Sequence, residues 1–507
     1  MKKLWKIITS RIFLTTFLLF LEFCILIGIL IWLGTGYYIY SILLYAFSGI
    51  MVLVVINRND NPAYKLAWVV CIMLIPTVGG VLYLIFGRKR TTRQMANTFQ
   101  KIEQDDLPYL PDHQELIQKI EAENPHCACQ ARAIFQTTKH SVFVNTVTDF
   151  LSPGEEKFCR MLIDLQKAEK FIFLEYFIIT PGKMWGEILK ILLQKASEGV
   201  DVRLIYDDFG TITTLPSGYD ETLQKAGIRT CVFNPYKARL NALMNNRDHR
   251  KILIVDGNIG YTGGINLADE YINEKERFGY WKDAAIVLEG EAVYSLTILF
   301  LRNWRYLTGE VPFYDKYRPT KEYPTDGYVM PFGDNPVAKE RVAEAAYLQI
   351  IHSAVHYVYI ETPYLVMDNE LTTALVLAAR SGVDVRIVTP HIPDKFYVHA
   401  LTTASYQELI ENGVKIYEYT PGFIHSKVIL ADDTVGMVGT ANFDFRSLYL
   451  HFECSVWLYR TSSLKQIKKD FLDILAVSQS VTLEDCNNVK WYQRFLRTLL
   501  KPFAPLM

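Results

Sequence analysis

Two stretches of the chain carry the same polar residues at the same spacing. HRKILIVDGNIGYTGGIN begins at residue 249, and HSKVILADDTVGMVGTAN begins at residue 425. Each has a histidine, a lysine two positions later, and then an aspartate, a glycine and an asparagine at matching intervals. The polar residues of the two copies are His249, Lys251, Asp256 and Asn266, and His425, Lys427, Asp432 and Asn442. A single His-x-Lys is common on exposed strands, whereas two complete copies in one chain indicate a shared chemical role.

The spacing within each copy predicts a strand followed by a turn. Side chains two residues apart on a strand face the same way, so each histidine should project together with its lysine. Asp256 and Asp432 belong to the candidate catalytic set. They fall at the turn, however, where aspartates commonly bond local backbone amides, so a structural role comes first. Asn266 and Asn442 are candidate substrate-binding amide donors.

If internal symmetry brings the two copies together, one site holds two imidazoles, two ammonium groups and two amides. Fixed donors and two cations suit a phosphate diester and the charge of its transition state. The two histidines would supply a nucleophile and a general acid/base. The repeat therefore predicts phosphoryl chemistry with half a site in each copy. A zinc site is the alternative, but the chain lacks His-Glu-x-x-His and paired Cys-x-x-Cys motifs, so no metal is expected.

The surrounding sequence is duplicated as well. Three further pairs of segments resemble each other in the same order: 170–179 with 356–365, 197–206 with 380–389, and 227–235 with 413–421. Patterns of buried strands and amphipathic helices alternate along both halves. We therefore predict an α/β fold class with two pseudo-symmetric lobes, each a mainly parallel sheet flanked by helices. The first lobe is expected over residues 141–315 and the second over 316–478.

Residues 1–90 have the composition of a membrane region. Apolar runs cover residues 12–33, 38–56 and 66–86, and each is long enough to cross a hydrocarbon core of about 30 Å as a helix. A signal peptide is a poorer interpretation of the first run, because two more apolar runs follow it. We expect a multi-pass region of two to three transmembrane helices. Pro76 makes the third run the one to bend or re-enter.

The position of the catalytic part relative to the membrane is less directly encoded. Basic clusters precede the first run, separate the second from the third and follow the third, so they give no single orientation. The spacing of the eight cysteines does not match a disulfide framework, which indicates that they are mostly reduced thiols. We therefore expect a cell-membrane protein whose catalytic part is cytoplasmic.

Two polar or amphipathic segments complete the chain. Residues 91–140 have the composition of a linker that contains a helix. In the C-terminal segment, residues 479–507, Trp491, Phe495 and Leu499 stand at helical spacing among basic residues. This pattern fits either an interfacial helix on an anionic lipid bilayer or a helix packed against the lobes.

The doubled motif resembles the phospholipase D superfamily, in which His-x-Lys-x4-Asp occurs twice. The match covers about residues 140–478. A finer resemblance to the bacterial cardiolipin synthases of that superfamily rests on NNRDHRKILIVDG, TPYLVMDNELTTALVLAARSGVDVRI, PGFIHSKVILADD and GTANFDFRS. The N-terminal strings NRNDNPAYKLAWVV and PTVGGVLYLIFGR are similar to the membrane region of the same enzymes.

The resemblance implies a phosphohistidine intermediate and no cofactor. In the implied reaction, His249 attacks the phosphorus of one phosphatidylglycerol while His425 protonates the departing glycerol. His425 then deprotonates a hydroxyl of a second phosphatidylglycerol, which yields cardiolipin. The implied partners are phosphatidylglycerol and other membrane phospholipid in an anionic bilayer, with no nucleic acid. Which histidine becomes covalent, and the oligomeric state, stay open.

The family also implies an acid about thirty positions after each histidine that orients the imidazole of the other half. Asp283 and Glu453 stand at these positions; the alternative is that each caps a strand or bonds a neighbour. Glu175 and Glu361 are repeated acids within apolar strands. They are expected either to line the site or to hold a lobe together, because a buried carboxylate needs a partner.

Two other functions use the same residues. A phospholipase D-type hydrolase would pass the phosphatidyl group to water, and only its acceptor site would differ. A membrane-anchored phosphodiesterase or nuclease is less favoured, because the chain shows no dense basic or aromatic groove pattern. The net charge of −1 gives no indication of a nucleic-acid partner either.

Overall fold

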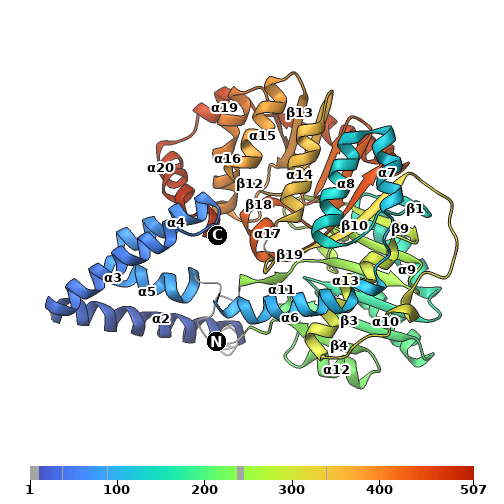
Figure 1. Ribbon diagram of the computed structural model, residues 1–507, viewed down its shortest axis with the longest axis horizontal. Helices are drawn as coiled ribbons and strands as arrows, with labels where there is room; N and C mark the ends of the chain where they lie inside the picture. The colour runs from blue at the N-terminus through green and yellow to red at the C-terminus, as the bar shows by residue number, and fades with distance from the viewer. Residues whose placement is uncertain (1–10, 37, 88–89, 237–244, 339, 507) are drawn as a thin grey trace.

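A computed structural model describes residues 11–36, 38–87, 90–236, 245–338 and 340–506. Two α/β lobes lie against each other, and an arm of N-terminal helices projects from one side of them (Figure 1). The expected two-lobed α/β class is confirmed.

The arm consists of short and long helices joined by short connections. They are α2 (Arg11–Gly36), α3 (Tyr38–Ile56), α4 (Pro62–Leu74), α5 (Pro76–Leu82) and the π-helical turn η1 (Tyr83–Gly87). Among the described residues, only α3 is long and apolar enough to cross a membrane. The third apolar run is divided at Ile75 and Pro76, because proline lacks the amide hydrogen that would continue the helix. One candidate span supports membrane association but not the expected multi-pass topology.

The sheet of the first lobe has seven strands in the order β1-β9-β7-β6-β2-β3-β4. Their bounds are Thr146–Leu151 (β1), Phe171–Tyr176 (β2), Asp201–Asp207 (β3), Arg229–Phe233 (β4), Lys251–Val255 (β6), Ile259–Gly263 (β7) and Ala285–Gly290 (β9). The helices of this lobe are α9 (Gly154–Gln166), α10 (Lys183–Ser197), α11 (Asp208–Thr211), α12 (Tyr219–Lys225) and α13 (Val293–Thr308).

The second sheet repeats this order strand by strand as β10-β19-β17-β16-β11-β13-β14, with β20 added at the end. Its strands are Tyr328–Asp334 (β10), Tyr357–Glu361 (β11), Asp384–Pro390 (β13), Lys415–Tyr419 (β14), Val428–Ala431 (β16), Val435–Gly439 (β17), His451–Tyr459 (β19) and Ser478–Ser480 (β20). The helices are α14 (Val342–Ser353), α15 (Asn369–Arg380), α16 (Phe396–Glu411), α17 (Phe445–Leu450) and α18 (Ser463–Ala476).

The strand directions differ from the expected mainly parallel sheets. Along these two strand orders, only β2-β3-β4 and the equivalent β11-β13-β14 run parallel, and the other neighbours are antiparallel. Helical crossovers connect the parallel strands, whereas the turns at Asp256 and Asp432 reverse the chain directly into β7 and β17. Both sheets are therefore mixed.

One hydrophobic core is common to the two lobes. Side chains of α13 pack there with Phe173 of the first sheet and Val456 of the second. The segment expected as a linker is helical: α6 (Arg90–Asp106) contributes Phe99 to this core, and α7 (Gln114–Glu123) and α8 (Pro125–Thr138) pack on the second lobe.

The C-terminal segment forms α19 (Leu483–Asn487), α20 (Trp491–Leu500) and the turn η6 (Lys501–Leu506). The turn packs against α4 and α17, while α20 contacts α16. Trp491, Phe495 and Leu499 nevertheless stay exposed, at 79%, 65% and 53%. The helix thus packs on the lobe while these three side chains stay exposed. It lies on the side of the lobes from which the N-terminal arm projects (Figure 1).

Candidate active site

Crossed strand pairs bring the two histidine motifs together. Ahead of His249, the short strand β5 (Arg247–Asp248) pairs in parallel with β19 of the other lobe. Ahead of His425, β15 (Gly422–Ile424) pairs in the same way with β8 (Tyr280–Lys282) of the first lobe. The backbone amides of His249 and His425 extend these ladders to Phe452 and Lys282, at 3.0 and 2.7 Å. Each histidine is therefore fixed to the opposite lobe by its own main chain.

Each imidazole also bonds a carboxylate from the opposite lobe. Nδ1 of His249 lies 3.0 Å from both carboxylate oxygens of Glu453. Nδ1 of His425 lies 2.7 Å from Oδ2 of Asp283. The structure thus places the two acids named from the family resemblance beside the histidines. With Nδ1 donating to a carboxylate, Nε2 of each ring is left with the lone pair that can attack or accept a proton.

The two carboxylates are held differently. Glu453 also accepts hydrogen bonds from the hydroxyls of Ser447 and Thr440. Asp283 accepts one from the backbone amide of Ala284 at 2.8 Å. Glu453 is therefore fixed by side chains of its own lobe, and Asp283 by its adjacent main chain.

The two lysines sit beneath the histidines and are fully enclosed. Lys251 Nζ donates to the carbonyl oxygen of His249 at 2.6 Å, and Lys427 Nζ donates to that of His425. Burial lowers the pKa of Lys251 to about 7, although nearby Glu453 opposes the shift. Burial likewise lowers the pKa of Lys427 to about 8, against the field of Asp283. An anion bound in the site would raise the pKa of both lysines and so favour their charged forms.

Burial also favours neutral histidines. It is the main reason that the pKa of His249 lies well below its usual range, and Lys251 and Lys427 lower it further. Burial and then Lys427 lower the pKa of His425 to about 4. At neutral pH both rings are therefore neutral, and a bound phosphate diester would raise their proton affinity.

Asp256 and Asp432, the two aspartates of the candidate catalytic set, lie away from the histidines and bond to the main chain in this geometry. Each lies at the far end of its strand from the histidine and takes a positive φ of 52°. Asp256 accepts hydrogen bonds from the backbone amides that open β2, those of residues 169–171. Asp432 does the same for residues 355–357 at the start of β11. The expected bonds to backbone amides are present, but their donors lie on a distant strand and not in the turn.

The two asparagines are buried and differ in their contacts. Asn266 accepts a hydrogen bond from the amide of Ile178 at 3.0 Å and donates to the Tyr271 hydroxyl at 2.7 Å. The backbone amide of Asn442 donates a hydrogen bond to the Ser447 hydroxyl oxygen at 2.9 Å, while no described group bonds its side-chain oxygen. Asn266 thus braces the wall of the site, and both remain candidates for substrate contact.

The repeated acids Glu175 and Glu361 hold their lobes together. Glu175 accepts a hydrogen bond from Asn303 of α13 at 2.8 Å and lies 3.5 Å from the Arg250 guanidinium. Glu361 accepts one from the Ser426 hydroxyl. Arg250 and Ser426 are the middle residues of the two His-x-Lys triplets, so these acids position the motifs from behind.

Aromatic rings enclose both histidines, and the motif search did not identify them. Phe177 and His451 lie 5.1 and 5.2 Å from the His249 ring. Trp281 and Tyr271 lie 5.5 and 5.6 Å from the His425 ring. His451 and Trp281 precede the two orienting acids by two residues, and this matching position was the available sequence signal.

One described group has the donor set for a metal ion. Ligand atoms of His249, His451 and Glu453 lie within 4.8 Å of one another. The Arg446 guanidinium, however, donates to Nε2 of His451 at 3.1 Å. A fixed positive charge beside the cluster disfavours a second cation, so the residues fit a metal poorly.

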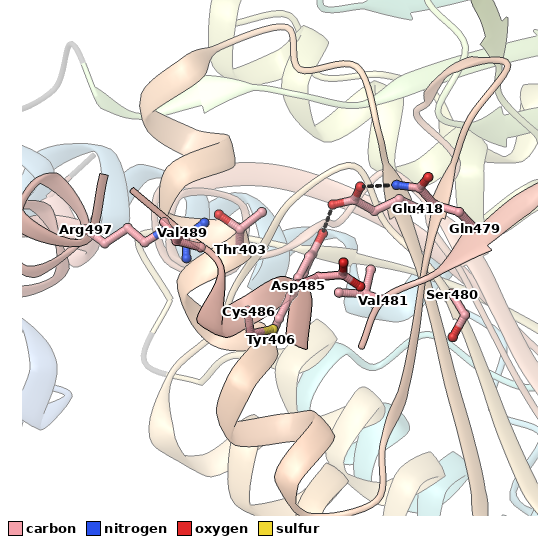
Figure 2. A pocket seen from close by; sticks show the side chains of 10 residues that line it. All are labelled: Thr403, Tyr406, Glu418, Gln479, Ser480, Val481, Asp485, Cys486, Val489 and Arg497. Atoms are coloured by element: carbon pink, nitrogen blue, oxygen red, sulfur yellow. Dashed lines mark hydrogen bonds between the residues drawn. The ribbon is translucent and has the colours of Figure 1, made fainter. Parts of the chain in front are cut away.

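A cavity of about 310 Å³ lies elsewhere in the second lobe, between α16, β20 and α19. Figure 2 shows one of its carboxylates, Glu418, hydrogen-bonded to Tyr406 and Gln479, at 3.3 and 3.2 Å. None of the candidate site residues lines the cavity, so we assign it no part in the chemistry.

Family models and individual relatives of this chain indicate the same family. The family described as cardiolipin synthase, PLD-like domain, matches residues 161–294 and 347–475, and the phospholipase D-nuclease N-terminal family matches 46–88. A cardiolipin synthase of Halalkalibacterium halodurans is 33% identical over 98% of this chain and 100% of its own length. An uncharacterized Streptococcus mutans protein is 42% identical over 90% of this chain and 99% of its own.

The fold has a solved counterpart. The crystal structure of a phosphatidylserine synthase from Haemophilus influenzae superposes with a TM-score of 0.57 at 16% identity, covering 74% of this chain and 97% of that one. At this identity the likeness concerns the fold alone.

The role of Asp256 can be tested by Asp256→Asn. The amide keeps the shape and tolerates a positive φ, but its NH2 group faces backbone N–H donors. We expect the free energy of unfolding to fall by about 1–3 kcal/mol, with kcat per folded molecule within about threefold of wild type. Denaturant unfolding and single-point kinetics measure both. A kcat loss of a hundredfold in a folded variant would restore a catalytic role.

The lysine pKa values predict an alkaline loss of activity. The positive charges of Lys251 and Lys427 attract the anionic substrate below their pKa values of about 7 and 8, and disappear as the pH rises through them. We expect kcat/KM, which reports the free enzyme, to fall above pH 7–8. Lys251→Arg keeps its charge, so its remaining activity should decline only at the higher pH set by Lys427. A profile that stays flat to pH 10 would contradict this assignment.

Proposed function

We propose, because this chain belongs to the cardiolipin synthase family of phospholipase D-like proteins, that it joins two phosphatidylglycerol molecules into cardiolipin and glycerol at the membrane. The observation that carries the proposal is the pair of crossed histidine–carboxylate contacts, with one lysine beneath each histidine. This arrangement supplies a nucleophile, an acid/base and two cations around one point, which a phosphate diester exchange requires.

In the first step, Nε2 of His249 attacks the phosphorus of one phosphatidylglycerol. The P–N bond forms as the bond to the glycerol headgroup breaks, and His425 gives its proton to the departing oxygen. The bound diester supplies the negative charge that allows His425 to carry this proton despite its low pKa in the empty site. Glu453 stabilises the charge that develops on the His249 ring.

In the second step, His425 takes the proton from a hydroxyl of a second phosphatidylglycerol. The oxygen attacks phosphorus, the P–N bond breaks, and His249 is released. The two steps exchange one phosphodiester for another, so no nucleotide is consumed. Assignment of the covalent role to His249 follows the family pattern.

Transfer to lipid is favoured over hydrolysis by the enclosure of the site. His249 and His425 are only 8% and 7% exposed, and aromatic rings surround both. A site of this kind limits bulk water, while a membrane-associated enzyme meets its acceptor lipid at high local concentration. A phospholipase D-type hydrolase would be expected to keep a wetter approach to the phosphohistidine.

The exposed face of α20 supports a second contact with the bilayer. Trp491, Phe495 and Leu499 project outward, and Lys490 and Arg494 stand beside them. Apolar side chains flanked by cations suit the interface of an anionic membrane. The lobes would then rest on the cytoplasmic leaflet, next to the helix that anchors them.

The catalytic assignment predicts equal amounts of two products. Purified protein with headgroup-labelled phosphatidylglycerol in mixed micelles should release glycerol and form cardiolipin in a one-to-one ratio. His249→Ala and His425→Ala should each lower the rate by about a thousandfold or more, because the two histidines act as a unit. Thin-layer separation of lipids and counting of free glycerol measure both products. Phosphatidic acid as the main lipid product would show a hydrolase.

The α20 assignment predicts a defect specific to bilayers. Trp491→Ala with Phe495→Ala removes the apolar contact, so we expect activity on anionic vesicles to fall about tenfold or more. Activity in detergent micelles should change much less, since the substrate is then delivered without a bilayer. Phe313→Ala is a matched control, because Phe313 is 70% exposed outside the C-terminal segment. Equal losses in both lipid systems would refute the interfacial role.

A further inference from the structure

A cavity of about 560 Å³ lies where the N-terminal arm meets the second lobe. Its volume is in the range of pockets that hold small ligands, about 300–1,000 Å³. We propose that this cavity is a binding site for the headgroup and glycerol backbone of a phospholipid, whose acyl chains run along the arm towards the bilayer. The inference rests on the proposed function and adds the place where one lipid substrate is held.

The cavity has an apolar wall and a polar wall. The arm supplies the apolar side chains of Val55, Trp68, Tyr83 and Phe86. It also supplies polar residues around the start of α4, which are Asn59, Asp60, Asn61 and Lys65. The opposite wall is polar and comes mainly from the second lobe, with Arg341, Glu344, Glu370 and Tyr449. A phospholipid has the same division between its acyl ends and its headgroup. The apolar side chains come from the candidate span α3 and from the neighbouring α4 and η1. A lipid bound here would therefore direct its acyl chains along the arm and its headgroup towards the second lobe.

Two chain segments next to the active site also line the cavity. Asn245 and Asn246 line the cavity and lead directly into β5 and His249. Leu450 also lines it and immediately precedes His451, whose ring lies 5.2 Å from that of His249. A headgroup held here therefore lies against the wall of the active site.

Arg341 gives the wall a cation that suits a phosphate. Arg341 donates to the backbone carbonyls of Asn335 and Pro336, at 3.4 and 3.2 Å, and lies over the Tyr449 ring. In the described part of the chain no carboxylate forms an ion pair with it. Burial, together with the hydrogen bond to Asp368, raises the pKa of Glu344 to about 9. Glu344 is thus protonated at neutral pH. The other charged side chains of the lining are Asp60, which is paired with Arg58 at 2.7 Å, Lys65 and Glu370.

An unsatisfied hydroxyl faces the same space. Tyr64 lines the cavity, and its buried OH has no hydrogen-bond partner among the described residues. A buried hydroxyl without a partner is costly. A phosphate or glycerol oxygen of a bound lipid would satisfy it.

The cavity is a built feature of the fold. Asn61, at the start of α4, donates to Asp368 at 3.1 Å and to the Tyr449 hydroxyl at 2.8 Å. Tyr64 packs its ring against Phe445 and Tyr449. These contacts lock α4 onto the second lobe, so the two walls keep a fixed separation.

Two reactions of the same enzyme test the site. Exchange of labelled glycerol into phosphatidylglycerol needs one lipid only, whereas cardiolipin formation needs two. We expect Arg341→Gln and Tyr64→Phe to lower cardiolipin formation at subsaturating lipid, by about tenfold or more for Arg341→Gln. The matched control is Arg386→Gln, which removes a guanidinium paired with Asp384 on the same lobe, away from the cavity.

The exchange reaction identifies which lipid is bound. Normal exchange with reduced cardiolipin formation means that the cavity holds the acceptor, and loss of both means that it holds the donor. If both rates in both variants stay within about twofold of Arg386→Gln, the proposal is wrong.

A binding measurement separates this proposal from the catalytic one. Photoreactive phosphatidylglycerol in vesicles would be crosslinked to the His249→Ala protein, and the labelled peptides identified by mass spectrometry. We expect label on residues 59–68 and 341–344, reduced by Arg341→Gln. This result would stand even if the enzyme made no cardiolipin. Label that avoids both segments would overturn the proposal whatever the enzyme makes.

Discussion

The crossed contacts between histidine and carboxylate are the constraint on which the site depends. His249 is oriented by Glu453 and His425 by Asp283, and in each pair the two partners belong to different lobes. The short parallel ladders β5-β19 and β8-β15 hold the backbones at the same crossing. Neither lobe alone can fix the ring of its own histidine, so the duplicated chain forms one site and not two.

Burial gives this site its electrostatic character. Two lysines and two histidines are enclosed with only two carboxylates in direct contact with the rings, and the pKa values of all four bases are lowered. An anion that enters the site raises the pKa values of these bases and favours their protonated forms. The phosphate diester thus completes the charge balance of the site, and its binding favours protonation of the general acid.

The sequence allowed much of this arrangement to be predicted, because the duplication fixed both periodicity and position. His249, Lys251, His425 and Lys427 follow from the spacing, and the two-lobed α/β class follows from the repeated strands. The partners of Asp256 and Asp432 were not predictable, since the amides they bond lie some 75 to 87 residues away. The rings around the histidines were predictable only in part: His451 and Trp281 stand at matching positions two residues before the orienting acids, but their contacts with the histidines of the other lobe are not encoded by that spacing. The antiparallel strand pairs were not predicted either, because strands joined by hairpins and strands joined by helical crossovers have similar compositions.

The six-residue helix α17 joins the catalytic geometry to the membrane arm. Its Ser447 hydroxyl bonds Glu453, which orients His249. Two residues later, Tyr449 accepts the hydrogen bond from Asn61 at the start of α4. A displacement of the arm would therefore act on α17 directly, and through Ser447 on the carboxylate that sets the His249 ring. The position of the arm on the second lobe is thus coupled to the geometry of the site. Directional hydrogen bonds from Asn61 fix that position more narrowly than apolar packing alone would.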